Sequence, residues 1–214
     1  MSGRAGARIL LPMALAWLSA GAHAQTSPND VIQEAADLLD KALEGRKEEL
    51  AANREELYKV INDILLPRFD RTYAAQLVLG PHWKTASKVQ RQQFIDAFYQ
   101  SLLQKYADGV LDYDESRVEI LPFRGDLAKP RVIVRTIVRL DDGTKVPVDY
   151  NLVKRAAGWL LFDVSIEGIS YVRNFRVEMN AEIQQSSLDS VIARLQKETS
   201  VGASGDGSSG SGTP

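Results

Sequence analysis

Between residues 131 and 170 the chain alternates apolar and polar side chains with a period of two, which is the pattern of half-buried β-strands. Turn residues at 141–143 and at 155–157 divide this region into three strands. A shorter alternation before it ends at Pro122, and since proline cannot donate to a β-ladder, it predicts an edge strand. We therefore expect an antiparallel meander of about four strands with one apolar face.

The length of the first turn decides the register of the sheet. A three-residue turn with Gly143 in the left-handed conformation places Val138 opposite Val146 and Val134 opposite Tyr150, so the apolar side chains share one face. A two-residue turn would slip the pairing by one residue and turn that apolar set to water. The three-residue turn is therefore favoured.

A three-residue turn at 155–157 places Leu160 opposite Leu152 and Phe162 opposite Tyr150, by the same reasoning. Three strands would then share one continuous apolar face. The opposite face would carry a cross-strand charge cluster formed by Arg135, Asp149 and Asp163. Exposed charge pairs are common and weak, so we interpret this cluster as a solvated surface and keep a docking face as the alternative.

Apolar side chains at helical spacing account for most of the remaining chain. Start and stop signals predict helices over residues 28–44, 54–66, 70–79, 88–109, 171–184 and 188–199. The helix from residue 88, which opens with a Ser87–Gln90 capping box, carries a broad aromatic stripe. Such a stripe packs into a core or forms the wall of a cavity, and the spacing leaves both open. Helices on either side of a meander predict an α+β domain with the helices gathered on one face of a curved sheet.

The two ends of the chain differ in composition from its middle. Residues 1–24 combine two arginines, a short apolar run and an Ala-His-Ala pattern, which predicts a secretory signal peptide cleaved after Ala24. Its apolar run is too short for a convincing membrane anchor. Residues 25–199 form the predicted domain, and residues 200–214 form a Gly/Ser-rich tail with no core-forming side chain.

Composition excludes several kinds of chemistry. Removal of the signal peptide would change the net charge from −2 to −4, because that segment holds two arginines and no acid, and this acidity disfavours nucleic acid as a partner. The chain has no cysteine, and His82 would be the single histidine left, which argues against thiol catalysis and metal sites. The acids between Asp108 and Glu115 lack the spacing of a calcium loop. We therefore expect no metal and no cofactor.

Several stretches together resemble a known family. They are ILLPRFD at 64–70, LVLGPHWKTASKVQRQQFIDAF at 77–98, KYADGVLDY at 105–113, GWLLFDVSIEGISYVRNFR at 158–176 and SLDSVIARLQ at 187–196. The Leu-Gly-x-x-Trp run and the Trp-x-x-x-Asp-Val-x-x-Glu-Gly-Ile-Ser run carry most of the specificity. The chain resembles the MlaC-type periplasmic phospholipid-binding proteins, the toluene-tolerance family of ABC-transporter auxiliary components.

The resemblance implies an apolar cavity, between the sheet and a helical subdomain, that holds phospholipid acyl chains as cargo. It implies a soluble periplasmic carrier that maintains outer-membrane lipid asymmetry. Its partners would be an outer-membrane lipoprotein–porin complex and an inner-membrane ABC transporter with a lipid-binding ring. The side chains expected to line the cavity are Phe94, Phe98, Leu102, Tyr106, Val132, Val134, Val148, Tyr150, Phe162, Val164, Ile166, Ile169 and Val172.

Two alternatives stay open on the residues alone. An isomerase or hydratase on a similar α+β cone would use a buried carboxylate such as Asp70 or Asp96 as its base, with Tyr150 as a hydrogen-bond donor. The predicted register brings no carboxylate to the apolar face of the central strands. An interaction module with a solid core is the other alternative.

Overall fold

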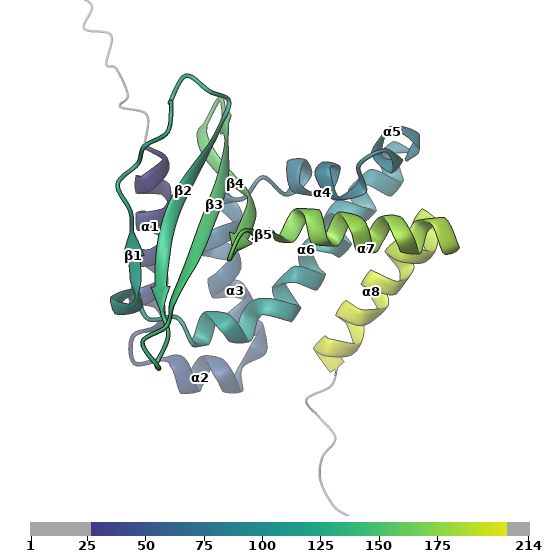
Figure 1. Ribbon diagram of the computed structural model, residues 1–214. Coiled ribbons are helices and arrows are strands. Elements are labelled where there is room, and N and C mark those ends of the chain that lie inside the picture. Colours follow the sequence, from purple (N-terminus) through teal and green to yellow (C-terminus); the bar gives the residue numbers. More distant parts are fainter. Residues whose placement is uncertain (1–26, 205–214) are drawn as a thin grey trace, which may run out of the picture.

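A computed structural model describes residues 27–204, so the predicted signal peptide and most of the predicted tail lie outside the described residues (Figure 1). The strands are β1 Val118–Ile120, β2 Arg131–Arg139, β3 Lys145–Arg155, β4 Gly158–Ile166 and β5 Ile169–Ser170, in that order across one antiparallel sheet. The helices are α1 Pro28–Leu43, α2 Lys47–Ala52, α3 Arg54–Leu65, α4 Arg71–Leu79, α5 His82–Thr85, α6 Lys88–Leu111, α7 Tyr171–Gln185 and α8 Leu188–Ser204. The α+β class is confirmed, with one strand more than expected.

Local signals placed the helix starts correctly. Ser27 and Ser87 each form a complete capping box, and Asn53 and Asp70 accept a hydrogen bond from the third residue beyond them. These contacts satisfy backbone donors that a first turn leaves without a partner. The helices differ from expectation in two ways. Helices α2 and α5 were not predicted, and α8 runs to Ser204, five residues past its predicted end at residue 199.

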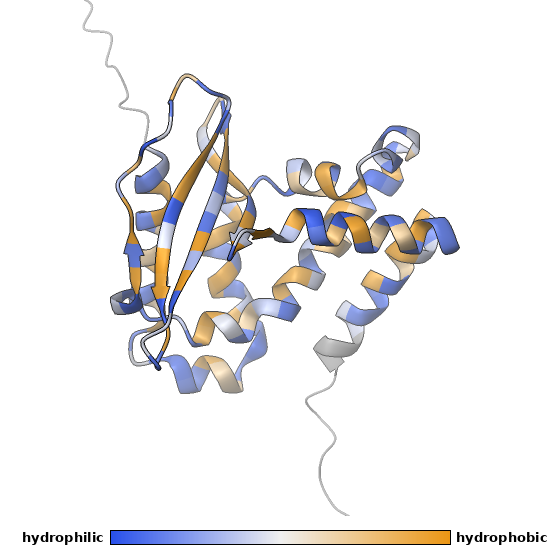
Figure 2. Cartoon of the chain, viewed as in Figure 1, coloured by the Kyte–Doolittle hydropathy of each residue, from blue (hydrophilic) through white to orange (hydrophobic). Residues whose placement is uncertain are grey.

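The register between β2 and β3 is confirmed. Val138 pairs with Val146 and Val134 with Tyr150, and Gly143 adopts a φ of 83° in the turn. Thr136, which is fully buried on this face, donates its hydroxyl to the Val148 carbonyl oxygen at 3.0 Å. Figure 2 shows the alternation of hydrophobic and hydrophilic residues along both strands.

The predicted register between β3 and β4 is wrong. Arg155 pairs with Gly158, so the turn has two residues, and Tyr150 lies opposite Val164 instead of Phe162. A β-bulge reconciles the short turn with the apolar pattern: Leu152 pairs with Leu161 and Asn151 with Asp163, which leaves Phe162 as the extra residue. The bulge switches the alternation by one residue and returns Val164 and Ile166 to the apolar face.

The helices divide between two regions, which Figure 1 shows to the left and right. Helix α1 lies on the apolar face of the sheet, where Val31 and Ile32 pack against β2 and β4. Helices α4, α6, α7 and α8 pack on one another beside the sheet, around a core that includes Phe94, Phe98 and Met179. A third cluster joins α1, α2 and α3 to the C-terminal half of α6. Within the described residues, no helix is both long and apolar enough to cross a membrane.

Candidate functional site

The predicted cavity residues of the sheet fall into two groups. Val132 and Val134 are buried against Val31, Ile32 and Trp159, so α1 fills the space in front of them. We predicted this stretch as a cavity wall, and the structure makes it packed core instead. Helix α1 covers it because its stripe of branched side chains meets the equally branched face of β2.

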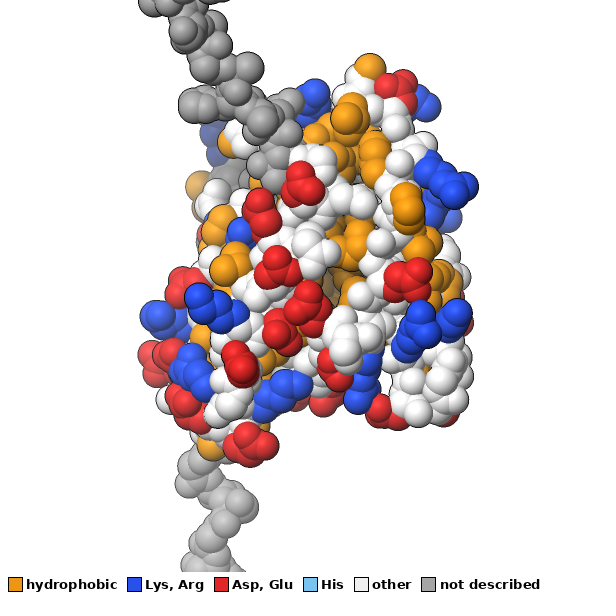
Figure 3. All heavy atoms as spheres, turned by 90° about the vertical axis from the view of Figure 1, so that its left-hand side faces the viewer, with side chains coloured by type: hydrophobic (Ala, Val, Ile, Leu, Met, Phe, Trp, Pro, Cys, Tyr) orange, Lys and Arg blue, Asp and Glu red, His pale blue; other side chains and the backbone are white. Residues whose placement is uncertain are grey.

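The second group lies further along the same face. Val148 pairs with Ile166 and Tyr150 pairs with Val164, and of these four only Val148 is fully buried. Burial raises the pKa of Tyr150, although part of its side chain still meets solvent. Figure 3 shows hydrophobic side chains in a hollowed band on the face that bears α1 and β1, with acidic side chains on one flank.

Tyr113 is a polar group near this part of the sheet that the sequence did not single out. Its hydroxyl is buried and has no hydrogen-bond partner among the described residues. Burial raises the pKa of Tyr113 far above its usual range, and nearby Glu115 and Tyr150 raise it further. The phenol therefore stays neutral and keeps an unused donor, which a bound polar group would satisfy.

The predicted residues of α6 do not face the sheet as expected. Phe94 is completely buried and stacks on Phe98 at 5.5 Å between ring centroids, and Phe98 meets the Phe175 ring of α7 edge-on at 5.2 Å. Leu102 and Val172 are partly buried around the same cluster. The prediction that Phe94 lines a cavity shared with the sheet is therefore wrong, because α4, α7 and α8 enclose this end of α6.

Tyr106 lies where α6 passes the start of α7. Its ring is 38% exposed and meets Tyr171 edge-on at 5.5 Å. The Lys105 ammonium lies over both the Tyr106 and Phe175 rings, at 5.7 and 5.6 Å. Burial, followed by Tyr171 and Glu178, raises the pKa of Tyr106. This aromatic patch is neutral and partly solvated, and one cation lies above it.

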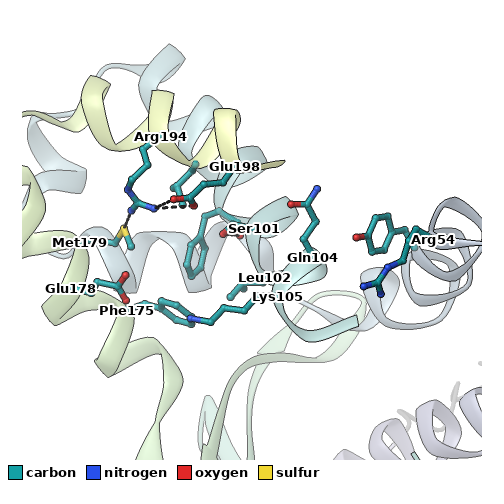
Figure 4. A pocket seen from close by; sticks show the side chains of 13 residues that line it. Arg54, Ser101, Leu102, Gln104, Lys105, Phe175, Glu178, Met179, Arg194 and Glu198 are labelled. Atoms are coloured by element: carbon teal, nitrogen blue, oxygen red, sulfur yellow. Dashed lines mark hydrogen bonds and ion pairs between the residues drawn. The ribbon is translucent and has the colours of Figure 1, made fainter. Parts of the chain in front are cut away.

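Next to this patch is a pocket of about 390 Å³ between α3, α6, α7 and α8 (Figure 4). Its apolar lining consists of Phe98, Leu102, Phe175, Met179 and Leu195. Its charged lining consists of Arg54, Lys105, Glu178, Arg194 and Glu198. A volume of this size is within the range of small-molecule sites, and an apolar lining with charges suits an amphiphile.

The charges of the pocket are partly matched with one another. Arg194 donates to Glu182 from Nε at 2.7 Å and from Nη2 at 2.6 Å, and from Nη1 to Glu198 at 2.9 Å. These contacts raise the pKa of Arg194, so the guanidinium is a permanent charge. Lys105 has only aromatic rings as partners among the described residues, which leaves its ammonium donors available at the pocket edge.

Two further predicted lining residues lie elsewhere. Ile169 on β5 is 57% exposed and packs in none of the core clusters of the described residues. Phe162, displaced by the bulge, packs edge-on against Tyr73 of α4 at 5.1 Å between ring centroids. The position of Phe162 differs from expectation because the predicted β4 alternates without interruption and so lacks the bulge.

We predicted that Asp163 belongs to a solvated charge cluster, and the structure shows instead that it is buried. It is 8% exposed and accepts hydrogen bonds from the Ser170 hydroxyl at 2.7 Å and from the Val172 amide at 3.0 Å. It lies opposite Asn151, while Asp149 lies opposite Arg135 and Ser165. The carboxylate of Asp163 thus holds the first turn of α7 to β4.

The carboxylates considered as catalytic bases have other contacts. Asp70 caps α4 and pairs with Arg155 at 2.7 Å, and Asp96, which is exposed, pairs with Arg71 at 3.6 Å. His82 shares a hydrogen bond of 2.9 Å with Asn180. Within residues 27–204, no group of three His, Asp or Glu side chains is placed to hold a metal.

The sequence model of the MlaC protein family matches residues 33–197, nearly the whole described region. The chain belongs to the MlaC protein family. The family resemblance drawn from the sequence motifs is thereby confirmed.

Relatives of this MlaC-family chain carry names that concern phospholipid transport and toluene tolerance. The intermembrane phospholipid transport system binding protein MlaC of Haemophilus influenzae is 24% identical over 183 residues, which cover 84% of this chain and 85% of that protein. The toluene tolerance protein ttg2D of Pseudomonas putida is 28% identical over 167 residues, covering 78% and 77%.

A solved structure shares the fold. The phospholipid-binding protein from Ralstonia solanacearum, determined in complex with a phospholipid, matches with a TM-score of 0.72 and 23% identity. The match covers 82% of this chain and 98% of that one.

Proposed function

We propose that this MlaC-family protein is a phospholipid carrier that moves lipid through the periplasm between the two membranes. It would exchange lipid with an outer-membrane lipoprotein–porin complex and with an inner-membrane ABC transporter that bears a lipid-binding ring. Phospholipid would be its cargo, with no cofactor and no catalysis. The observation that carries the proposal is family membership over residues 33–197, and a partly exposed apolar face of the sheet and a pocket with apolar lining support it.

The energetics of lipid transfer explain why such surfaces suit the task. Each methylene taken out of water contributes about 0.8 kcal/mol, so a chain of about sixteen carbons resists entry into water by roughly 12 kcal/mol. A carrier lowers this cost by offering apolar surface of similar extent, and it needs no bond-making group.

The partly exposed face of Tyr150, Val164 and Ile166 is the apolar surface we assign to the acyl chains. The pocket lined by Leu102 and Phe175 is the second apolar surface we assign to the lipid, with Lys105 at its edge near the phosphate of the headgroup. Because a single flexible cation recognises a phosphate and little beyond it, selectivity among headgroups should be weak.

The test is to purify the protein from cells and extract bound lipid for mass spectrometry. We expect close to stoichiometric phospholipid in the wild type, and several-fold less in Val164→Glu and Leu102→Glu, since each places a carboxylate on the acyl-chain surface. Val177→Glu is the matched control, because Val177 is 67% exposed on α7. Circular dichroism and urea unfolding must show that the variants fold.

Two results would contradict the proposal. A wild-type protein that is empty after purification and stays empty with liposomes would refute the carrier function. Folded Val164→Glu and Leu102→Glu variants that retain full lipid would refute the assigned site while leaving the function standing.

A further inference from the structure

The loop from Leu121 to Pro130, which joins β1 to β2, leaves a hollow of about 580 Å³ between itself and the start of β2. Figure 1 shows this loop bowing away from the sheet. The loop is structured: the Phe123 ring packs on the core of the sheet, and Asp126 caps a turn by accepting from the Ala128 amide. The hollow is thus a fixed feature of the fold.

One side of this hollow is an unpaired strand edge. The ladder between β1 and β2 ends where the Leu121 amide donates to the Arg135 carbonyl at 2.9 Å. The Pro130 carbonyl oxygen accepts a hydrogen bond from the Lys154 amide of β3. Backbone groups alternate in direction along a strand, so those of even-numbered β2 residues bond to β3 and those of odd-numbered β2 residues point toward the opposite edge. The backbone groups of Arg131 and Ile133 therefore point into the hollow, where no backbone partner among the described residues meets them.

The hollow is strongly basic although the chain as a whole is acidic. Its lining includes the four cations Arg124, Lys129, Arg131 and Arg135, and the single acid Asp126. Within residues 27–204, no ion pair or side-chain hydrogen bond engages these four cations. The apolar surface between them is contributed by Phe123, Val132 and Ile133, and Ile133 is 42% exposed.

We propose that this edge binds an extended acidic peptide segment of a partner protein, which adds to the sheet as a strand beside β2. The backbone of the peptide would bond the N–H and C=O groups of Arg131 and Ile133, and its acids would pair with the unpaired cations. A second copy of this chain is disfavoured, because two such edges would bring their own arginines together.

The period of two predicts the pattern of the peptide. Arg131, Ile133 and Arg135 have exposed side chains on one face of β2. Positions 1 and 3 of the added strand would face Arg131 and Ile133 and should be acidic and apolar, and position 5 should be acidic so that it meets the Arg135 side chain diagonally, because Leu121 already bonds the Arg135 backbone. Positions 2 and 4 would point to the opposite face, toward Phe123 and Val132, and should be apolar. The expected binding motif of the peptide is therefore three apolar residues with an acidic residue on each side.

The binding test uses the full-length protein and a fluorescent peptide with the core Glu-Val-Ile-Val-Glu, followed by anisotropy. We expect saturable binding that weakens at least tenfold in Arg131→Glu/Arg135→Glu. The control is Arg173→Glu, an exposed arginine of α7 that lies outside the hollow and should leave binding unchanged. Hydrogen exchange must show new protection at the Arg131 and Ile133 amides.

Strand addition is separated from simple charge attraction in two ways. Ile133→Pro removes an edge donor, and a peptide N-methylated at alternate amides removes its partners without changing the protein. Either change should abolish binding. The proposal is overturned if a scrambled peptide of equal charge binds as well, if the edge amides gain no protection, or if anionic phosphatidylglycerol vesicles bind the hollow while the peptide does not.

Discussion

The hydrogen bonds of Asp163 provide a quantitative test of how the two regions of the molecule are joined. Replacement by alanine removes the acceptor of the Ser170 hydroxyl and of the Val172 amide, which belongs to the first turn of α7. A hydrogen bond to a charged group contributes about 1.5–3 kcal/mol, and a donor left without a partner in a buried site adds to the loss. We therefore expect Asp163→Ala to lower the free energy of unfolding by about 3 kcal/mol.

Asparagine at position 163 keeps one oxygen acceptor and loses the charge, so Asp163→Asn should cost about half as much. Asp149→Ala is the matched control, because Asp149 lies on the same face of the sheet and, within residues 27–204, accepts no hydrogen bond from a helix terminus. A change within about 0.5 kcal/mol is expected there.

The assay is urea unfolding followed by circular dichroism and by tryptophan fluorescence. For a domain of this size, 3 kcal/mol corresponds to a fall in Tm of roughly 6–12 °C. A loss below about 1 kcal/mol in Asp163→Ala would refute the assignment, since it would mean that α7 keeps its position without the carboxylate. Because Phe175 and Met179 of α7 line the pocket, the same variant should also retain less lipid.

Three further predictions concern stability. Tyr113→Phe removes a buried hydroxyl that has no partner among the described residues, so it should leave the free energy of unfolding unchanged or raise it by up to about 1 kcal/mol. Tyr99→Phe loses a 2.6 Å hydrogen bond to Asn62 and should lower that free energy by about 1 kcal/mol. Urea unfolding measures both, and the reverse order would contradict this prediction. Glu167, at a φ of 51° in a two-residue turn, is strained, so Glu167→Asn should raise the unfolding free energy by about 0.5–1 kcal/mol, and a loss would count against the turn geometry. Burial raises the pKa of Tyr150 in the folded state. The contribution of the neutral Tyr150 to the free energy of unfolding is therefore complete below about pH 10, the ordinary pKa of tyrosine, and is lost as the pH rises further. Urea midpoints should fall between about pH 9 and pH 11, and they should fall less in Tyr150→Phe.

The sequence was informative wherever one local signal decided the structure. Gly143 specified its turn and hence the register of β2 with β3, and Ser87 with Gln90 fixed the start of α6. At the next turn, Ala156 and Ala157 carry no such signal, and the bulge at Phe162 compensates the shorter loop, so the apolar pattern looks uninterrupted. Helix α2 was missed because it buries only one side chain.

The candidate site was harder to predict than the fold for a physical reason. Periodicity shows which face of an element is buried, and it does not show which element covers that face. Phe94 and Val134 are both buried as expected, but one is covered by neighbouring helices and the other by α1. The unpaired hydroxyl of Tyr113 and the cation above Tyr106 depend on contacts between distant segments, which no local pattern contains.

Helix α6 has a mechanical consequence for loading and release. Its 24 residues make a rod about 36 Å long, with Phe94 and Phe98 embedded in one core and Leu103 and Ala107 in another. Because both ends of α6 are packed in a hydrophobic cluster, the helix cannot tilt without disrupting one of the two clusters. Any movement that widens the pocket for a lipid must therefore come from the elements around α6, chiefly from α7. Helix α7 is held to the sheet by the Asp163 side chain.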